Sequence, residues 1–283
     1  MLKSLTLIAL GLSTLIYAGI WLRALLQRGQ LQRPTAAQFA TGAVTNFFDT
    51  LGIGSFATTT AVFQFTRMVP DALIPGTLNA GHTIPVILQA FLYLAVIEVE
   101  PVTLVSMIAG ATLGAWFGAG WVAGLPLRQV RIGVGCALLA AFVAMLMRQL
   151  ALFPAGGEAL GLTGGKLAAA VAINASIAAI STLGIGFYAP CMTLVSLMGM
   201  NPAAAFPIMM GSGAFLMPAA SSRFVLRGSY APQVAIGLTL GGLVGVPIAA
   251  FIVKTLPLEA LRWLVMAVVL YAAQGTLRSA KRG

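Results

Sequence analysis

The sequence predicts an all-α integral membrane protein with two homologous four-helix repeats and one extra N-terminal helix. Hydrophobic residues make up 59% of the chain and charged residues 8%, against about 25% charged residues in an average soluble domain. The apolar residues come in long runs that suit lipid. The motif Thr-Leu-Gly-Ile-Gly also occurs twice, at 50–54 and at 182–186. Charged residues at 8% of the chain cannot supply the polar surface of a soluble protein, and we therefore expect the chain to be embedded in a membrane.

Nine apolar segments follow one another, at 4–22, 39–66, 72–97, 102–123, 131–150, 167–198, 203–222, 231–253 and 260–277. A helix needs about 20 apolar residues to cross the hydrocarbon core, and most of these segments are long enough. The loops are short, apart from 23–36 and 153–165. We therefore expect an N-terminal helix with its loop over 1–36, a first membrane repeat over 37–152 and a second over 166–283.

The first apolar segment is expected to be a retained transmembrane helix. Its strongest basic cluster follows the apolar run instead of preceding it, and no Ala-x-Ala site ends the run. Because basic residues collect on the cytoplasmic side of membrane proteins, this order predicts an N-terminus outside the cell.

The two halves match each other along most of their length. At an offset of 132 positions the matching pairs include Pro70 and Pro202, Pro75 and Pro207, and Gly81 and Gly213. After a one-residue gap the pairs are Gly110 and Gly241, Gly114 and Gly245, and Arg131 and Arg262. A colinear match of this length favours an internal duplication.

The segments 39–66 and 167–198 are unusual because each carries two glycines at its centre: Gly52 and Gly54, and Gly184 and Gly186. Glycine does little to hold a helix in its regular geometry. Unwound backbone is tolerated in a membrane only where it is buried in protein or lines a wet cavity. Matching breaks in two repeats are typical of the central binding site of a transporter.

The sequence leaves open whether these two broken segments cross the membrane. If all nine segments cross, each repeat has four crossings and the halves share one orientation. If the broken segments are re-entrant, seven crossings remain and the halves are inverted. Both alternatives have an odd number of crossings and place the C-terminus in the cytoplasm.

The net charge of +10 does not indicate a nucleic-acid partner. The basic residues lie in short gaps between apolar runs, as expected for cytoplasmic loops. The chain contains one histidine and two cysteines without metal-ligand spacing. We expect no metal site and no cofactor.

The repeated motifs resemble those of the sulfite exporter TauE/SafE family, also called the TSUP permeases. The first half carries Leu51-Gly52-Ile53-Gly54, Pro70, Gly76-Thr77-Leu78 and Leu125-Pro126, and the second carries Leu183-Gly184-Ile185-Gly186, Pro202 and Leu256-Pro257. The family's third motif glycine is replaced by Ser55 and Phe187, and Ile208-Met209-Met210-Gly211 stands where Gly-Thr-Ser is expected. The chain therefore resembles a divergent branch.

This resemblance implies a function and a location. Members of the family move sulfite, sulfoacetate or other organosulfonates without ATP. The resemblance also implies four-helix repeats, which favours nine crossings, and a multi-pass protein of a bacterial-type inner membrane. The expected partners are a small anionic substrate, the lipid bilayer and a coupling proton, with a homodimer left open.

Asp49 is the foremost candidate for chemistry. It lies inside an apolar segment directly before the glycine break, where an ionised carboxylate costs about 2.5–3.5 kcal/mol. Its counterpart in the second half is Ser181, so the fold does not require the charge. The functional interpretation is a proton-coupling or gating carboxylate. The alternative is a helix cap that pairs with amides freed at the break.

His82 is the second candidate for proton coupling. It is the only histidine, it lies one turn from Asn79, and its counterpart is Ala214. A histidine can transfer a proton or donate to an anion near neutral pH. A buried packing residue is the equal alternative.

Small polar residues around the breaks are expected to hold the substrate. Amides at a broken helix carry a partial positive charge that suits a sulfonate oxygen. Any single hydroxyl can instead bond back to its own helix. The predicted binding residues are Asn46, Asp49, Thr50, Gly52, Gly54, Ser55, Thr58, Asn79, His82, Asn174, Ser181, Thr182, Gly184, Gly186 and Tyr188, and Thr59 lies beside them.

Together these patterns predict a secondary transporter, expected to export a small organosulfur anion by alternating access about a central site. An anion channel is one alternative. Another is an intramembrane enzyme that uses Asp49, His82 or Cys191, although no catalytic signature is visible. A third is a subunit with no transport activity of its own. We do not expect the chain to be an enzyme.

Overall fold

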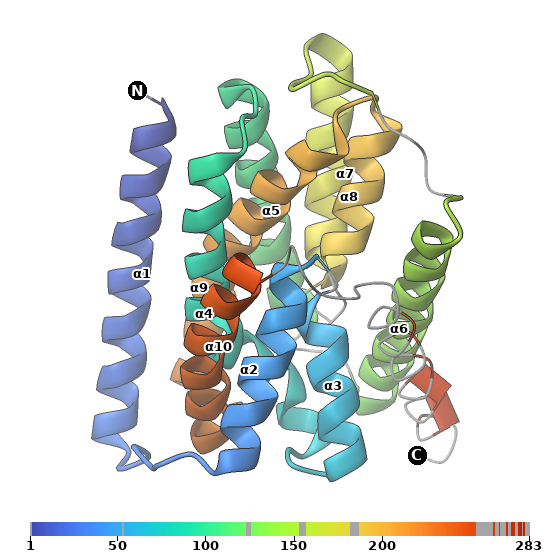
Figure 1. Cartoon of the computed structure of the whole chain (residues 1–283). Helices are drawn as coiled ribbons and strands as arrows, with labels where there is room; N and C mark the ends of the chain where they lie inside the picture. Colours follow the sequence, from blue (N-terminus) through green and yellow to red (C-terminus); the bar gives the residue numbers. More distant parts are fainter. Residues whose placement is uncertain are drawn as a thin grey trace.

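A computed structural model describes residues 2–52, 54–122, 126–152, 157–181 and 187–252, with single positions between 263 and 280. The described residues are almost entirely helical. In the first part of the chain the elements are α1 (Leu2–Gln27), α2 (Ala36–Thr50), α3 (Ser55–Thr66), the 3-10 helix η1 (Asp71–Leu73), α4 (Ile74–Val96), α5 (Pro101–Val122) and α6 (Leu127–Gln149). They continue with α7 (Gly164–Ser181), α8 (Tyr188–Leu197), the 3-10 helix η2 (Pro202–Ala204), α9 (Ala205–Arg227) and α10 (Pro232–Ile252) (Figure 1).

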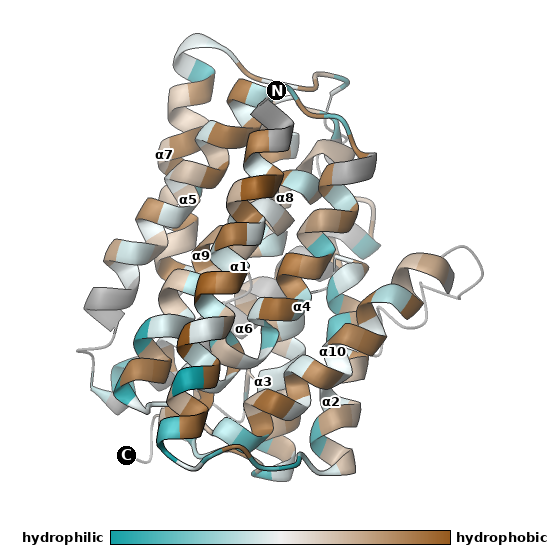
Figure 2. Ribbon diagram, turned by 90° about the vertical axis from the view of Figure 1, so that its left-hand side faces the viewer, coloured by the Kyte–Doolittle hydropathy of each residue, from teal (hydrophilic) through white to brown (hydrophobic). Residues whose placement is uncertain are grey.

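Four of these helices are long and apolar enough to cross a membrane, over Leu5–Gln27, Pro101–Gly118, Gly164–Ser181 and Pro232–Phe251. Large apolar side chains such as Leu15, Phe117 and Phe251 are exposed on the outer surface. Figure 2 shows apolar residues covering much of α1 and α10, with hydrophilic residues near their lower ends. A surface of this kind suits lipid and fits a helical membrane protein.

One end of the bundle, here called the Arg28 end, joins α1, α4, α9 and α10. The Arg28 guanidinium donates to the carbonyls of Val225 and Leu226, at 2.9 and 2.7 Å, and so covers the last turn of α9. The Ala231 amide, directly before α10, donates to Thr77 Oγ1 of α4 at 2.9 Å.

The opposite end, here called the Glu100 end, joins the start of α5 to the segment before α7. The Glu100 carboxylate accepts hydrogen bonds from the amides of Val102 and Thr103 and thus caps α5. The Glu100 amide donates to the Leu160 carbonyl, and the Leu162 amide donates to Thr103 Oγ1.

Helices α2 and α3 form a hairpin that enters and returns at the Arg28 end. The start of α2 is fixed there because Gly237, near the start of α10, packs against Gln38. The end of α3 is fixed there because Phe63 packs with Ile74 and Val234, which lie near the starts of α4 and α10. This path favours the re-entrant alternative for the first broken segment over the crossing that the family resemblance favours. The physical reason is that the end of α3 and the start of α2 both pack near the start of α10, so α3 brings the chain back to the end at which α2 began.

The start of α7 and the end of α8 both lie at the Glu100 end. Helix α7 begins directly after Leu162, which is bonded to Thr103. After α8 the chain returns to the same end, where the Gly157 amide donates to the Met200 carbonyl and the Asn201 amide to the Ala159 carbonyl. The two hairpins therefore enter the bundle from opposite ends (Figure 1).

Each hairpin packs against a long helix of the other half, α2 against α10 and α7 against α5. Glycines make both contacts close. A Cβ on Gly114 would lie 2.0 Å from the Ala175 carbonyl oxygen, and a Cβ on Gly245 would lie 2.0 Å from the Ala43 carbonyl oxygen. Glycine at positions 114 and 245 therefore permits close helix packing.

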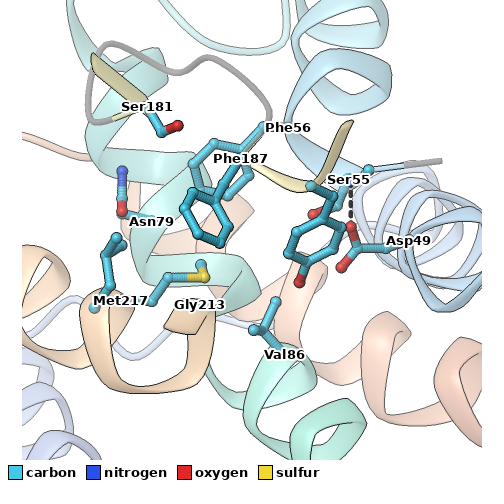
Figure 3. Close-up of a pocket in the computed structure, with 12 residues that line it drawn as sticks. Asp49, Ser55, Phe56, Asn79, Val86, Ser181, Phe187, Gly213 and Met217 are labelled. Atoms are coloured by element: carbon cyan, nitrogen blue, oxygen red, sulfur yellow. Dashed lines mark hydrogen bonds between the residues drawn. The ribbon is translucent and has the colours of Figure 1, made fainter. Parts of the chain in front are cut away.

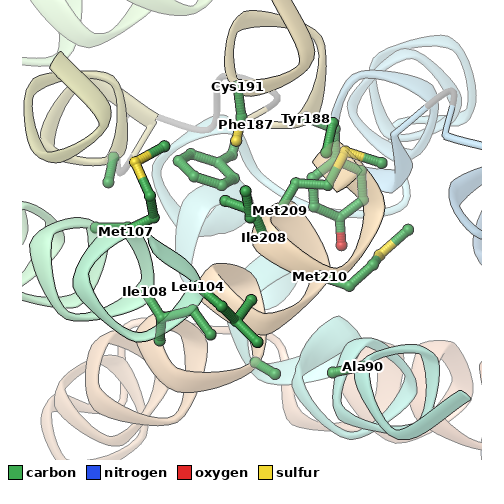
Figure 4. Packing of buried hydrophobic residues seen from close by; sticks show 14 of the residues in the cluster. Ala90, Leu104, Met107, Ile108, Phe187, Tyr188, Cys191, Ile208, Met209 and Met210 are labelled. Carbon is green, nitrogen blue, oxygen red and sulfur yellow. The ribbon is translucent and has the colours of Figure 1, made fainter. Parts of the chain in front are cut away.

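The apolar core lies towards the Glu100 end, around the start of α9. Its members include methionines and aromatic residues from α5, α8 and α9, such as Met107, Phe187, Met209 and Met210 (Figure 4). The predicted polar residues of α2, α3 and α4 lie outside this cluster.

Candidate functional site

A cavity of about 50 Å³ lies where the two hairpins meet. One water needs roughly 10–15 Å³ on this measure, so the cavity has room for a small solute or a few waters. Its lining comes from both halves of the chain (Figure 3): Asp49, Gly54, Ser55, Phe56, Asn79, Val86, Ser181, Phe187, Tyr188, Gly213, Leu216 and Met217.

The first break has the backbone geometry that its glycines allow. Gly52 has φ +78° and Gly54 has φ +92°, a region in which side-chain-bearing residues are strained. A Cβ on Gly52 would also lie 3.2 Å from the Phe206 ring. Helix α2 therefore ends at Thr50, and α3 starts at Ser55, which lines the cavity.

Asp49 lies at the centre of this break and is 1% exposed. Its Oδ1 accepts a hydrogen bond from the Ser55 amide at 2.5 Å. Its Oδ2 is buried and has no hydrogen-bond partner. The side chains of Gln89 and Tyr188 face the same carboxyl group. Asp49 therefore caps α3 with one oxygen and leaves the other unused.

Carbonyls freed at the end of α2 are bonded by two α4 side chains that the sequence reasoning missed. Tyr93 donates its hydroxyl proton to the Thr50 carbonyl. Gln89 Nε2 donates to the Asn46 carbonyl at 3.4 Å and to Thr50 Oγ1 at 3.2 Å. Gln89 Oε1 accepts from the Tyr188 hydroxyl at 3.5 Å, which links α4 to the second hairpin. The sequence signal that could have identified them is that Gln89 and Tyr93 are polar side chains four positions apart on one face of an apolar helix.

His82 is fully buried and is absent from the lining of the cavity. Its Nε2 lies 2.9 Å from Thr59 Oγ1, and its Nδ1 lies 3.1 Å from Asn46 Oδ1. Because Asn46 Nδ2 donates to the Gly42 carbonyl, Asn46 Oδ1 is the acceptor and His82 Nδ1 carries the proton. Both ring nitrogens are then satisfied in a neutral imidazole, and the coupling role of His82 stays a prediction.

Four further predicted residues bond back to their own helices. Thr50 donates to the Asn46 carbonyl, Thr58 to the carbonyls of Gly54 and Ser55, Asn79 to the Pro75 carbonyl and Ser181 to the Ile177 carbonyl. Asn79 and Ser181 nevertheless line the cavity, whereas Thr50 and Thr58 are absent from its lining.

The remaining predicted residues differ in their placement. Tyr188 lines the cavity. Asn174 Nδ2 donates to the Met107 carbonyl at 2.9 Å in the contact between α7 and α5, and Asn174 is absent from the lining. Three predicted residues lie outside the part of the chain that the structure describes: Thr182, Gly184 and Gly186.

The cavity combines one carboxyl group with aromatic and small polar surfaces. Among the described residues that line it there is no lysine, arginine or histidine. No group of three or more metal-binding side chains occurs among the residues described. The polar groups that line it besides Asp49 belong to Ser55, Asn79, Ser181 and Tyr188, and each already forms a hydrogen bond within the protein.

Comparisons with family models, with curated proteins and with solved structures found no match. The resemblance to the TauE/SafE family therefore rests on the sequence motifs alone.

Proposed function

We propose that the chain is a secondary transporter that carries a small anion together with a proton through the cavity between the two hairpins. The observation that carries this proposal is the meeting of two helical hairpins, from opposite ends of the bundle, at one buried carboxyl group. Helix breaks of this kind expose backbone donors to a solute without exposing them to lipid.

The arrangement of helices supports two inverted repeats. In each half a hairpin, a 3-10 helix and two long helices follow in the same order. The contact of Gly114 with Ala175 corresponds to that of Gly245 with Ala43, at the same offsets of 131 and 132 positions that relate the two halves of the sequence. Inverted repeats support alternating access because the two halves can exchange conformations. With both hairpins re-entrant, seven segments cross the membrane.

The charges at the two ends support one orientation. The Arg28 end carries many basic side chains, among them Arg28, Arg33 and Arg227, whereas Glu98 and Glu100 lie at the opposite end. The positive-inside rule puts the Arg28 end in the cytoplasm of a bacterial-type inner membrane. The start of α1 then lies outside the cell.

The substrate is proposed to be an anion because the first turn of α3 offers amide donors at a helix N-terminus. The Ser55 amide already holds the Asp49 carboxylate, so an anion meets a like charge unless Asp49 is protonated. A sulfonate or sulfite therefore moves with a proton. The direction of net flux follows the combined gradients of anion and proton.

A small cation is the second candidate substrate. Asp49 is the one charged group in the described lining, and the rings of Phe56 and Phe187 lie around the same space (Figure 3). Tyr188 also lines this cavity. A carboxylate with aromatic rings suits an ammonium group. Anion and cation transport predict opposite effects of neutralising Asp49.

An intramembrane enzyme has less support than a transporter. His82 is bonded to Thr59 and Asn46, and Cys191 lies in the apolar core. Neither forms a hydrogen bond with Asp49 in the described part of the chain. An enzyme would need these groups within reach of one reacting atom.

The test is tracer exchange in proteoliposomes that contain the purified protein. The solutes are sulfite, sulfoacetate, taurine, sulfolactate, simple carboxylates and methylammonium. We expect saturable counterflow of at least one anion, with no exchange by Gly52→Val, because valine is strained at φ +78° and would meet Phe206. Gly11→Val, at a position with open space around it, is the matched control. Exchange of methylammonium alone, or flux that does not saturate, would contradict the proposal.

A further inference from the structure

We propose that Asp49 is a tethered competitor of the transported anion: its carboxylate holds the Ser55 amide that the anion needs, and protonation of Asp49 releases that amide. This inference rests on the proposed function and specifies how the proton and the anion are linked at one site. Asp49 then acts as a switch in the binding site as well as a helix cap.

The α3 N-terminus has no cap of its own. The residue at its N-cap position is Gly54, which has no side chain, and no side-chain cap bond is formed there. Asp49 fills this role from the preceding helix, six positions earlier, because the break turns the chain back on itself. The carboxylate therefore occupies the place at which a helix N-terminus binds an anion.

The second observation is that Asp49 is not satisfied as a purely structural cap would be. Its Oδ2 is buried without a partner, and Asp49 lines the cavity. In Figure 3 one carboxylate oxygen is bonded to Ser55 while the other points away from it. A buried carboxylate oxygen without a donor is costly, and a proton lowers that cost because it removes the charge.

The surroundings leave the proton as the means of neutralising Asp49. From α4 the facing groups are Gln89 and Tyr93, and from α8 they are Tyr188 and, behind it, Cys191. His82 is held by Thr59 and Asn46. No basic side chain is found in the described lining.

The repulsion that protonation removes is large compared with ordinary binding contacts. Two like charges about 4 Å apart repel by about 4 kcal/mol at an effective dielectric constant of about 20. An anion at the α3 N-terminus therefore excludes an ionised Asp49. Because binding then requires one proton, the affinity for the anion rises about tenfold for each unit by which the pH falls, until Asp49 is protonated in the free protein.

The experiment is calorimetric titration of the purified full chain with methanesulfonate, which keeps its single negative charge from mildly acidic to mildly alkaline buffer. We expect wild-type affinity to rise about tenfold per pH unit on acidification. Asp49→Asn removes the charge and with it the repulsion between the carboxylate and the anion, so it should bind methanesulfonate at every pH with no pH dependence. Glu98→Gln, which changes a carboxylate at the Glu100 end, should keep the wild-type dependence.

A second pair of variants tests the Ser55 amide itself. Ser55→Pro removes that N–H at the first position of a helix, where proline is tolerated, and it should lose methanesulfonate binding at every pH. Ser55→Ala keeps the N–H and should bind. If Ser55→Pro fails to fold, the Asp49→Asn result decides alone.

Four outcomes overturn the inference. If wild type binds methanesulfonate with no pH dependence, or if Asp49→Asn keeps the wild-type pH dependence, the link to Asp49 is wrong while anion transport stands. If Asp49→Asn loses binding at every pH, the carboxylate contributes to the site instead of competing for it. If wild type neither binds nor exchanges any anion of the panel, the proposed function fails and the inference fails with it.

Discussion

At the scale of single residues, the central feature is the bond between Asp49 and Ser55 across the helix break. A charge inside an apolar run is visible in the sequence, so Asp49 could be chosen as a candidate. Its partner could not, because which amide an aspartate reaches depends on how the break turns. Gln89 and Tyr93 were missed for the same reason: their polarity is visible, but the carbonyls that they bond belong to another helix.

Gln89→Leu is expected to destabilise the protein and slow exchange. The substitution leaves the Asn46 carbonyl without one donor and the Tyr188 hydroxyl without its acceptor, and an unsatisfied buried polar group costs about 1–3 kcal/mol. Thermal unfolding in detergent measures the loss of stability, and counterflow in proteoliposomes measures the rate of exchange. Gln32→Leu, in an exposed loop, is the control, and equal behaviour of the two variants would remove the bridging role of Gln89.

His82→Gln should lower the rate of anion exchange but keep its dependence on pH. Both imidazole nitrogens have partners in the neutral form, so we expect His82 to position Asn46 and Thr59 instead of carrying the coupled proton. The measurement is the initial rate of counterflow across a range of pH. Loss of the pH dependence in this variant would return the coupling role to His82.

At the scale of elements, the sequence predicted the broken helix but not the direction taken after the break. Two glycines permit either a kinked crossing or a hairpin, since both need the same local freedom. Contacts decide between them, because Phe63 packs against the start of α4 and against α10, which lies far along the chain. The matched glycines Gly114 and Gly245 were more informative, because the helices that face them come too close to leave room for a side chain.

Gly114→Ala and Gly245→Ala should each lower the stability of the protein by about 1–3 kcal/mol. The new methyl group would meet a backbone carbonyl oxygen of the facing helix at 2.0 Å, which the helices can relieve only by moving apart. Gly11→Ala and Gly19→Ala are matched controls because nothing lies within 4 Å of a Cβ there. Thermal unfolding in detergent checks the result, and equal midpoints for all four variants would disprove close packing.

The cap on α5 should make the Glu100 end sensitive to acid. Hydrogen bonds from the amides of Thr103 and Val102 lower the pKa of Glu100 below its ordinary value. A carboxylate whose pKa is lower in the folded state stabilises that state above its unfolded pKa and ceases to do so as the pH falls through its folded pKa. Wild type should therefore unfold at a higher temperature than Glu100→Gln in neutral buffer, and the difference should vanish in acid. A constant difference would contradict this role.

At the scale of the whole molecule, the sequence predicted two repeats but left open how they are oriented relative to each other. The nine-crossing and the seven-crossing topologies both place most basic residues on one side of the membrane, so the distribution of charge does not distinguish between them. The family resemblance favoured nine crossings, whereas the path of α2 and α3 favours a hairpin. The reciprocal contacts of α2 with α10 and α7 with α5 became evident only in three dimensions.

Cysteine labelling from the two sides of the membrane tests the topology. In a chain in which the exposed Cys136 is replaced by serine, we expect Gln32→Cys and Thr66→Cys to label from the cytoplasm. Thr163→Cys and Ala203→Cys should label from outside. Labelling of Gln32→Cys and Thr66→Cys from opposite sides would show that the first broken segment crosses the membrane.

The most direct test of the account is the accumulation of a sulfonate in proteoliposomes with an acidic exterior and a neutral interior. Wild type is expected to concentrate the anion above its external level and to lose this gradient when a protonophore is added. Asp49→Asn should exchange the anion at a similar rate without concentrating it. Accumulation by Asp49→Asn equal to that of wild type would contradict proton coupling at the meeting point of the hairpins.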